Sequence, residues 1–263
     1  MPDPQFWLVP DMDNVMILIS VTLCLLLGIY AYLRKVLNAG ASIIASLMGL
    51  ILIIYADFFW FLLLLFFLIS SYFATMWQYE RKKGRGMSEG MRGERGVRNV
   101  LSNGTIPVLI ALMNQPLDSI RPGLSGFLFV TAIAAAGADT FASEIGILAD
   151  NPRMIIHPSH HVSPGVDGGV SMLGNIAAFF GALMISIVGV VLVSNLMLQW
   201  GPHEMNFWIL PIITASVLGW IGCQTDSILG ATLQQRGILS NNTVNLAAIL
   251  FTVILAVPVY LVI

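Results

Sequence analysis

Apolar residues occur along this chain in long stretches that short polar segments separate. A helix needs about 20 residues to cross the hydrocarbon core of a bilayer. The segment 104–117 is short and contains Pro107 and Asn114, so a broken or re-entrant helix is expected there. The pattern predicts an all-α polytopic bundle of about seven or eight transmembrane helices. The candidate spans are 15–33, 41–56, 58–77, 104–117, 123–138, 171–198, 207–224 and 244–263.

The composition supports a membrane protein. Of the 263 residues, 57% are hydrophobic and only 10% are charged, whereas charged residues make up about a quarter of an average soluble domain. The apolar stretches lack the alternation of a transmembrane barrel. We therefore treat residues 1–263 as one integral membrane domain. We expect the membrane as its partner and no nucleic acid.

The basic residues predict the orientation. With eight spans, eleven of the twelve Lys and Arg residues fall on one side, and only Arg121 falls on the other. The positive-inside rule then places both termini outside and three loops in the cytoplasm: residues 78–103, 139–170 and 225–243. A seven-span arrangement would lose this asymmetry. The basic cluster from Arg81 to Arg85 is expected to set the topology and to contact anionic headgroups.

Polar side chains gather where two of the predicted spans end on the cytoplasmic side. In "GADTFASEIGILADNPRMI", Asp139 and Ser143 are four residues apart and share a helix face, and Thr140 and Glu144 form the neighbouring stripe. Asp226 and Ser227 repeat the pairing of an acid and a hydroxyl at the end of a later span. A single helix cap would explain one Asp but not the whole group. Carboxylates brought together here would suit Mg²⁺.

The flanking loops supply groups that suit phosphate. The segment "RNVLSNG" provides guanidinium and amide groups, of which Arg98 and Asn103 are the expected ligands. The stretch "VSPGVDGGVSMLG" enters a span through Gly168, Gly169 and Ser171, as phosphate-binding turns do, although the pattern alone is weak. Further candidates are Arg153, Gln234, Asn242 and Asn245. The loop histidines His157, His160 and His161 are expected to be solvated rather than metal ligands.

These motifs resemble a known family. "GADTFASEIGILADNPRMI", "VSPGVDGGVSMLG", "TDSILGATLQ" and "NNTVNL" occur in the order found in the membrane-protein family of transmembrane protein 19 and the chloroplast phytyl-phosphate kinase, which carries the domain of unknown function 92. The resemblance covers residues from about 81 to the C-terminus. Phe141 stands where the family usually has Trp. A threonine near the glycines is replaced, so no role is assigned to Asp167.

The resemblance implies a lipid-phosphate kinase. A nucleoside triphosphate, CTP or ATP with CTP favoured, would give its γ-phosphoryl group to a prenyl monophosphate. Asp139, Glu144 and Asp226 would be catalytic and would hold Mg²⁺. Arg98 and Arg153 would neutralise phosphate oxygens, and Gly168 and Gly169 would cradle one phosphate. The expected substrate-binding set is Arg98, Asn103, Thr140, Ser143, Arg153, Gly168, Gly169, Ser171, Ser227, Gln234, Asn242 and Asn245.

Two other functions remain open from the sequence. The same groups would serve a CTP-dependent synthase of CDP-lipids, and the identity of the labelled product would separate it from a kinase. A lipid or solute transporter would need polar residues through the middle of several spans. The middles of 15–33, 58–77 and 244–263 are almost entirely hydrocarbon, so an enzyme is favoured over a transporter.

Overall fold

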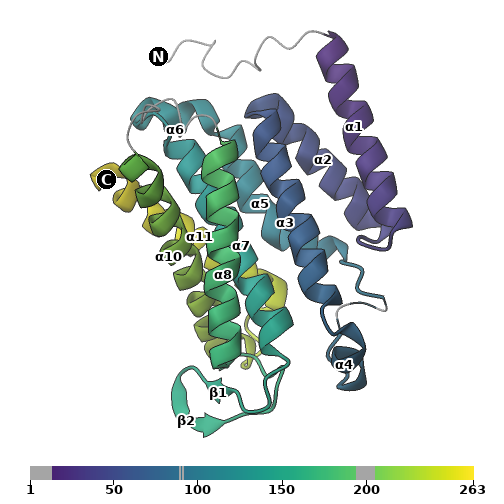
Figure 1. The fold of residues 1–263 in the computed structure, drawn as a ribbon, viewed down its shortest axis with the longest axis vertical. Coiled ribbons are helices and arrows are strands. Elements are labelled where there is room, and N and C mark those ends of the chain that lie inside the picture. The colour runs from purple at the N-terminus through teal and green to yellow at the C-terminus, as the bar shows by residue number, and fades with distance from the viewer. Residues whose placement is uncertain (1–13, 89, 91, 194–204) are drawn as a thin grey trace.

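The computed structural model describes residues 14–88, 90, 92–193 and 205–263, and the side chains from residue 208 onward in the last segment. The end of the expected span 171–198 lies outside the described residues, as do the acidic residues Asp3, Asp11, Asp13 and Glu204. Figure 1 shows a bundle of helices with a small sheet at one end. The helices are α1 (Asn14–Leu33), α2 (Ala39–Tyr55), α3 (Phe58–Met76), α4 (Tyr79–Gly84), α5 (Val97–Leu112), α6 (Asn114–Ile120), α7 (Leu124–Gly146), α8 (Met172–Leu192), α10 (Met205–Leu229), the π-helical turn η2 (Gly230–Gln234) and α11 (Asn241–Val262).

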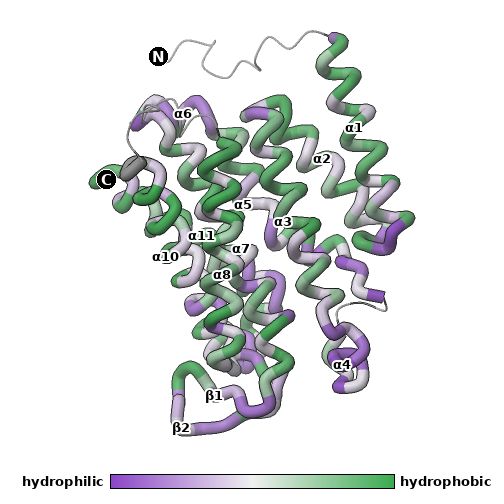
Figure 2. Tube along the Cα trace, in the orientation of Figure 1, coloured by the Kyte–Doolittle hydropathy of each residue, from purple (hydrophilic) through white to green (hydrophobic). Residues whose placement is uncertain are grey.

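The predicted class, an all-α polytopic membrane bundle, is confirmed. Six helices of the described chain are long and apolar enough to cross a membrane, namely α1, α3, α7, α8, α10 with η2, and α11. The helices α2 and α5 are apolar but shorter. Together they correspond to the eight candidate spans. Figure 2 shows hydrophobic residues along the middle of the bundle and hydrophilic residues at its two ends.

The fourth predicted span lies in a different register from the observed helix. The expected segment was 104–117, but α5 runs from Val97 to Leu112 and includes Pro107, and α6 begins at Asn114. The segment "RNVLSNG" is therefore the first part of a helix rather than the end of a loop. Its polar side chains occupy the early turns of the helix, and they lower the average hydropathy there below that of a membrane span. The consequence is that Asn99 and Asn103 lie on one helix face.

Helix α7 occupies the centre of the bundle. Every residue from Leu124 to Ala138 is buried. Its small side chains let α8 and α10 approach closely: a methyl group added at Gly137 would lie 2.9 Å from Ile185 of α8, and one at Gly219 would lie 2.9 Å from Ala134. Close backbone approach through small residues is typical of membrane helix pairs. In α8, the small residues Ala177, Ala178, Gly181 and Ala182 are buried as well.

One end of the bundle, here called the polar end, carries the three loops that the charge pattern grouped together. Figure 1 shows α4 and the sheet at this end, with α6 and the C-terminus at the other. The sheet has the order β2-β1-β3 and is antiparallel, with β1 (Arg153–Met154) between β2 (His157–His161) and β3 (Gly169–Val170). The three histidines lie on β2 and are exposed. The polar end is thus assembled from segments far apart in the sequence.

Candidate functional site

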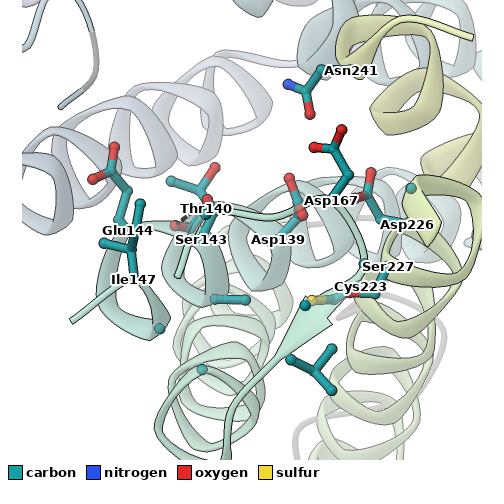
Figure 3. A pocket seen from close by; sticks show the side chains of 18 of the residues that line it. Asp139, Thr140, Ser143, Glu144, Ile147, Asp167, Cys223, Asp226, Ser227 and Asn241 are labelled. Carbon is teal, nitrogen blue, oxygen red and sulfur yellow. Dashed lines mark hydrogen bonds between the residues drawn. The ribbon is translucent and has the colours of Figure 1, made fainter. Parts of the chain in front are cut away.

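A polar pocket of about 410 Å³ opens at the polar end. Its walls are the ends of α7 and α10, the beginnings of α5, α8 and α11, the turn η2 and the loop before β3. Most of the residues expected from the sequence line it, as Figure 3 shows for several of them. The expected residues found in the pocket wall are Asn103, Asp139, Thr140, Ser143, Glu144, Gly168, Gly169, Ser171, Asp226, Ser227, Gln234 and Asn245.

Three aspartates converge in this pocket. Figure 3 shows the carboxylates of Asp139, Asp167 and Asp226 turned toward the same region. Asp139 comes from α7 and Asp226 from the last turn of α10. Both helices lead into the same pocket, and both carboxylates line it. Their approach within range of a shared ion stays a prediction.

The hydrogen bonds of the two helix-borne carboxylates differ. Asp139 Oδ2 accepts a hydrogen bond from Asn245 Nδ2 at 3.2 Å. Asp226 Oδ2 is buried and has no hydrogen-bond partner within the part of the chain that the structure describes. A buried carboxylate oxygen without a partner is energetically costly. Together with the two neighbouring carboxylates, it has the chemistry of a cation ligand.

Asp167 joins this group from a loop, and no role was expected for it from the sequence. The loop is held by a hydrogen bond from Gln235 Nε2 to the Asp167 backbone oxygen at 2.7 Å. Gly168 has a φ of +75°, and an added Cβ there would collide with Ala231 of η2. Partial desolvation at the pocket mouth raises the pKa of the Asp167 carboxyl, and a hydrogen bond with Gln234 opposes this shift. Only glycine at position 168 allows the loop to lie this close to α10.

Glu144 is not brought to the three aspartates, which differs from the expected metal set. Figure 3 places it on the other side of the pocket. Its Oε2 accepts from Lys82 Nζ at 2.6 Å, and its Oε1 accepts from Thr75 Oγ1 at 2.7 Å. Lys82 is fully buried, so it is not among the headgroup contacts expected of the basic cluster. The pair joins α4 to α7 across the wall of the pocket.

Three expected phosphate ligands do not line the pocket. Arg98 is exposed on α5, Arg153 is exposed on β1, and the pocket wall contains Asn241 rather than Asn242. The arginine that does reach the pocket is Arg95.

Arg95 was not among the residues expected from the sequence. It precedes α5, whereas Asn99 and Asn103, at i and i+4, lie on one face of that helix. The backbone of Arg95 is fixed by bonds to its neighbours: its N–H donates to Val36 O, and its carbonyl accepts from Asn38 N, both at 3.0 Å.

The turn at Gly168 and Gly169 was expected to bind a phosphate, but the Gly169 N–H is already hydrogen-bonded within the turn. The Gly169 N–H donates to Val166 O at 2.8 Å, and it is therefore engaged in the turn. Ser171 caps α8, because its hydroxyl accepts from Gly174 N at 3.0 Å. The first turn of α8 nonetheless opens into the pocket beside Gly174 and Asn175. An anion in this pocket would meet the helix start rather than the glycine pair.

The carboxylates in the pocket suit a divalent cation that takes only some of its ligands from the protein and the others from water and a bound phosphate. Among the described residues, no group of three or more His, Cys, Asp or Glu side chains is arranged to hold a metal ion by itself. Mg²⁺ characteristically takes one or two carboxylates and completes its shell with water and substrate phosphates. Two aspartates with a third nearby match that requirement better than a closed protein site would.

Comparison with known proteins places the chain in a family. The model of the integral membrane protein DUF92 family matches residues 22–253. An uncharacterized membrane protein of Methanocaldococcus jannaschii is 29% identical over 94% of this chain and 95% of its own. The chloroplast protein VTE6 of Arabidopsis thaliana is 26% identical over 72% of this chain and 56% of its own. Protein PGR of Arabidopsis thaliana is 30% identical over 45% of this chain and 49% of its own.

No solved structure matches the chain. The family model covers nearly the whole bundle, from the middle of α1 to the middle of α11, and it includes every segment that lines the polar pocket. The chain belongs to the DUF92 family of integral membrane proteins.

Proposed function

We propose that this chain is a Mg²⁺-dependent kinase of prenyl monophosphates. The observation that carries the proposal is the convergence of Asp139, Asp167 and Asp226 in a polar pocket at the end of a membrane bundle. The resemblance to the family of the chloroplast phytyl-phosphate kinase, together with the similarity to VTE6, supplies the substrate class. The donor is CTP or ATP, with CTP favoured, and the polar end faces the cytoplasm.

The metal would be held by Asp139 and Asp226, with Asp167 as a third oxygen ligand directly or through water. Bound there, Mg²⁺ would neutralise charge on the phosphate oxygens of the nucleotide, which is its usual contribution to phosphoryl transfer. The buried oxygen of Asp226 would gain the partner that it lacks among the described residues. Glu144 would act indirectly, because its carboxylate is already bound by Lys82 and Thr75.

Groups suited to anions line the same pocket as the aspartates. The starts of α8 and α11 contribute to the wall through Asn175 and Asn241, and helix N-termini favour phosphate. Arg95 adds a guanidinium group on the α5 side. A pocket that combines carboxylates with helix starts and an arginine suits a metal-bound polyphosphate.

The transfer requires no protein nucleophile. An ionised oxygen of the acceptor monophosphate attacks the γ-phosphorus, and a new P–O bond forms. The bond between the γ-phosphorus and the bridging oxygen breaks, and that oxygen leaves with the nucleoside diphosphate. The products are a prenyl diphosphate and a nucleoside diphosphate. Positioning and charge neutralisation, which this pocket supplies, are the main demands of such a step.

Transfer of label tests the function directly. We expect purified protein with Mg²⁺ and γ-labelled CTP or ATP to yield a labelled prenyl diphosphate from at least one prenyl monophosphate in a panel. Chelation of divalent cations should abolish the transfer. If α-labelled CTP labels the lipid and γ-labelled nucleotide does not, the kinase assignment fails and a CDP-lipid synthase replaces it.

Arg95 and Arg98 form a matched pair for testing the phosphate contacts. Arg95→Lys should lower kcat/KM about ten- to a hundredfold, because the planar fork is lost and a charge-assisted hydrogen bond contributes about 1.5–3 kcal/mol. Arg98→Lys should change it little, since Arg98 is exposed outside the pocket. Thermal unfolding in detergent checks that both variants fold. Equal losses in the two variants would contradict the role given to Arg95.

A further inference from the structure

A second cavity of about 500 Å³ lies beside the polar pocket and has the opposite character. It is bounded by α1, α2, α3 and α5, and we call it the apolar groove. Its wall is mostly hydrocarbon and aromatic, with Leu27 and Ala31 on one side and Leu64, Phe67 and Leu68 on the other. Cavities of about 300–1,000 Å³ with mainly apolar walls and a few polar groups are typical of small-molecule sites.

The apolar groove and the polar pocket share one wall. Arg95, Asn99 and Asn103 line both cavities. Arg95 precedes α5, and Asn99 and Asn103 lie in its first two turns. A guanidinium and two amides therefore form the end of the apolar groove that adjoins the polar pocket. The three aspartates line the polar pocket.

The direction of the groove suits a lipid chain. Along α3 its wall runs from Tyr72 and Phe73, near the polar end, back to Phe61, a distance of about three helical turns. Along α1 it runs from Ala31 back to Cys24. Both walls lead from the polar end toward the hydrocarbon depth of the bundle. A chain lying in the groove would stay at membrane depth while its head group reached the pocket.

The wall at the shared residues is held in place by buried contacts. Arg95 is only 4% exposed and Leu37, in the turn between α1 and α2, is 1% exposed. These two residues form an isolated parallel bridge. The Arg95 guanidinium lies 3.5 Å from both Ser71 O and Thr75 Oγ1 of α3. The arginine is therefore fixed where α1, α2, α3 and α5 meet, which is the point where the two cavities join.

We infer that the apolar groove binds the isoprenoid chain of the acceptor and presents its phosphate to Arg95, Asn99 and Asn103. The inference rests on the proposed function for the identity of the acceptor. The occupant is a prenyl phosphate rather than bulk lipid, because the wall that the groove shares with the polar pocket holds a buried guanidinium and two amides, which are groups suited to a phosphate head group. The length of the groove would then set which chains are accepted.

Filling the groove tests its role in chain selection. Leu64 of α3 lines the groove about two helical turns beyond Tyr72, and Leu246 of α11 lines neither cavity; both are partly buried. We expect Leu64→Trp to raise KM for geranylgeranyl phosphate about tenfold or more and to change KM for geranyl phosphate little, because only the longer chain reaches the new ring. Leu246→Trp should leave both values unchanged. If the two variants show the same chain-length profile, the inference is overturned.

A binding measurement separates this inference from the proposed function. Wild-type protein in phosphatidylcholine nanodiscs is irradiated with a geranylgeranyl phosphate that carries a terminal diazirine, and the labelled peptides are mapped. We expect label in α1, α2, α3 or α5 that excess geranylgeranyl phosphate removes and additional phosphatidylcholine does not. Competed label confined to other helices, or no competed label, would overturn the groove. Competed label in the groove without any phosphoryl transfer would keep the groove and reject the kinase.

Discussion

Asp226→Asn is expected to abolish activity while leaving the protein as stable as before or more stable. The replacement keeps the shape of the side chain and removes the charge that would hold Mg²⁺. We expect kcat to fall by at least about a hundredfold, the scale seen when one electrostatic group of an active site is lost. Stability should not fall, because Asp226 Oδ2 has no hydrogen-bond partner among the described residues and Asp139 and Asp167 act on Asp226 electrostatically. Removing a strained charge in a functional site commonly stabilises a protein.

The measurements are γ-label transfer and the midpoint of thermal unfolding in detergent, with and without Mg²⁺ and nucleotide. Mg²⁺ with nucleotide should raise the midpoint of the wild-type protein and not that of Asp226→Asn. Asp150→Asn is the matched control, because Asp150 is an exposed aspartate at the polar end that pairs with Arg85 outside the pocket wall. Unfolding of Asp226→Asn would show that this carboxylate has a structural role, and retained activity would show that it does not hold the metal.

Lys82→Ala is expected to cost about 3–5 kcal/mol of stability, the usual penalty for removing one partner of a buried ion pair. Lys82 Nζ is fully buried, lies 2.6 Å from Glu144 Oε2 and also donates to Ala74 O at 3.1 Å. Its loss would leave the Glu144 carboxylate, whose side chain is 12% exposed, without its cation. The adjacent Lys83 is exposed, so Lys83→Ala should change the unfolding midpoint little and serves as the control.

A double variant separates the structural role of this pair from a chemical one. Replacing both partners, Lys82→Met with Glu144→Leu, should recover most of the stability that Lys82→Ala loses, because no unpaired buried charge remains. Unfolding midpoints of the single and double variants are the measurement. If Lys82→Ala is as stable as the wild type but inactive, the lysine acts on the substrate and the pair is not the structural link between α4 and α7.

Hydropathy was sufficient to predict the bundle, because long apolar stretches have few alternatives to membrane helices. It failed where a helix begins with polar residues. The first turns of α5 carry Arg98, Asn99 and Asn103, and a window that averages hydrophobicity places the helix too late. The four-residue spacing of Asn99 and Asn103 indicates a helix there, but Arg95 precedes α5 and is positioned by its bridge to Leu37, which spacing does not encode.

The candidate site was predictable where position in a span determines the environment, and unpredictable where tertiary contacts do. Asp139 and Asp226 end two parallel helices, so their approach follows from topology. Asp167 reaches them only because Gly168 packs against Ala231, a contact that no local pattern encodes. The partner of Glu144 is Lys82, and the residues of that pair are 62 apart in the sequence. Such pairings are fixed by packing and lie outside what spacing can indicate.

The enclosed position of α7 has a consequence for the order in which the chain assembles. Its most apolar window has a mean hydropathy of 1.5, below the 2.4 of α1 and the 2.3 of α8 and α11, and 89% of that window is covered by protein. Much of that cover comes from α8, α10 and α11, which the ribosome delivers after α7. During synthesis α7 therefore enters the membrane or translocon before the helices that cover it have been made, and it carries Asp139 in its second half. In chains truncated before α10, α7 should be the first helix to leave the bilayer. Such chains would then be recognised by cellular quality control.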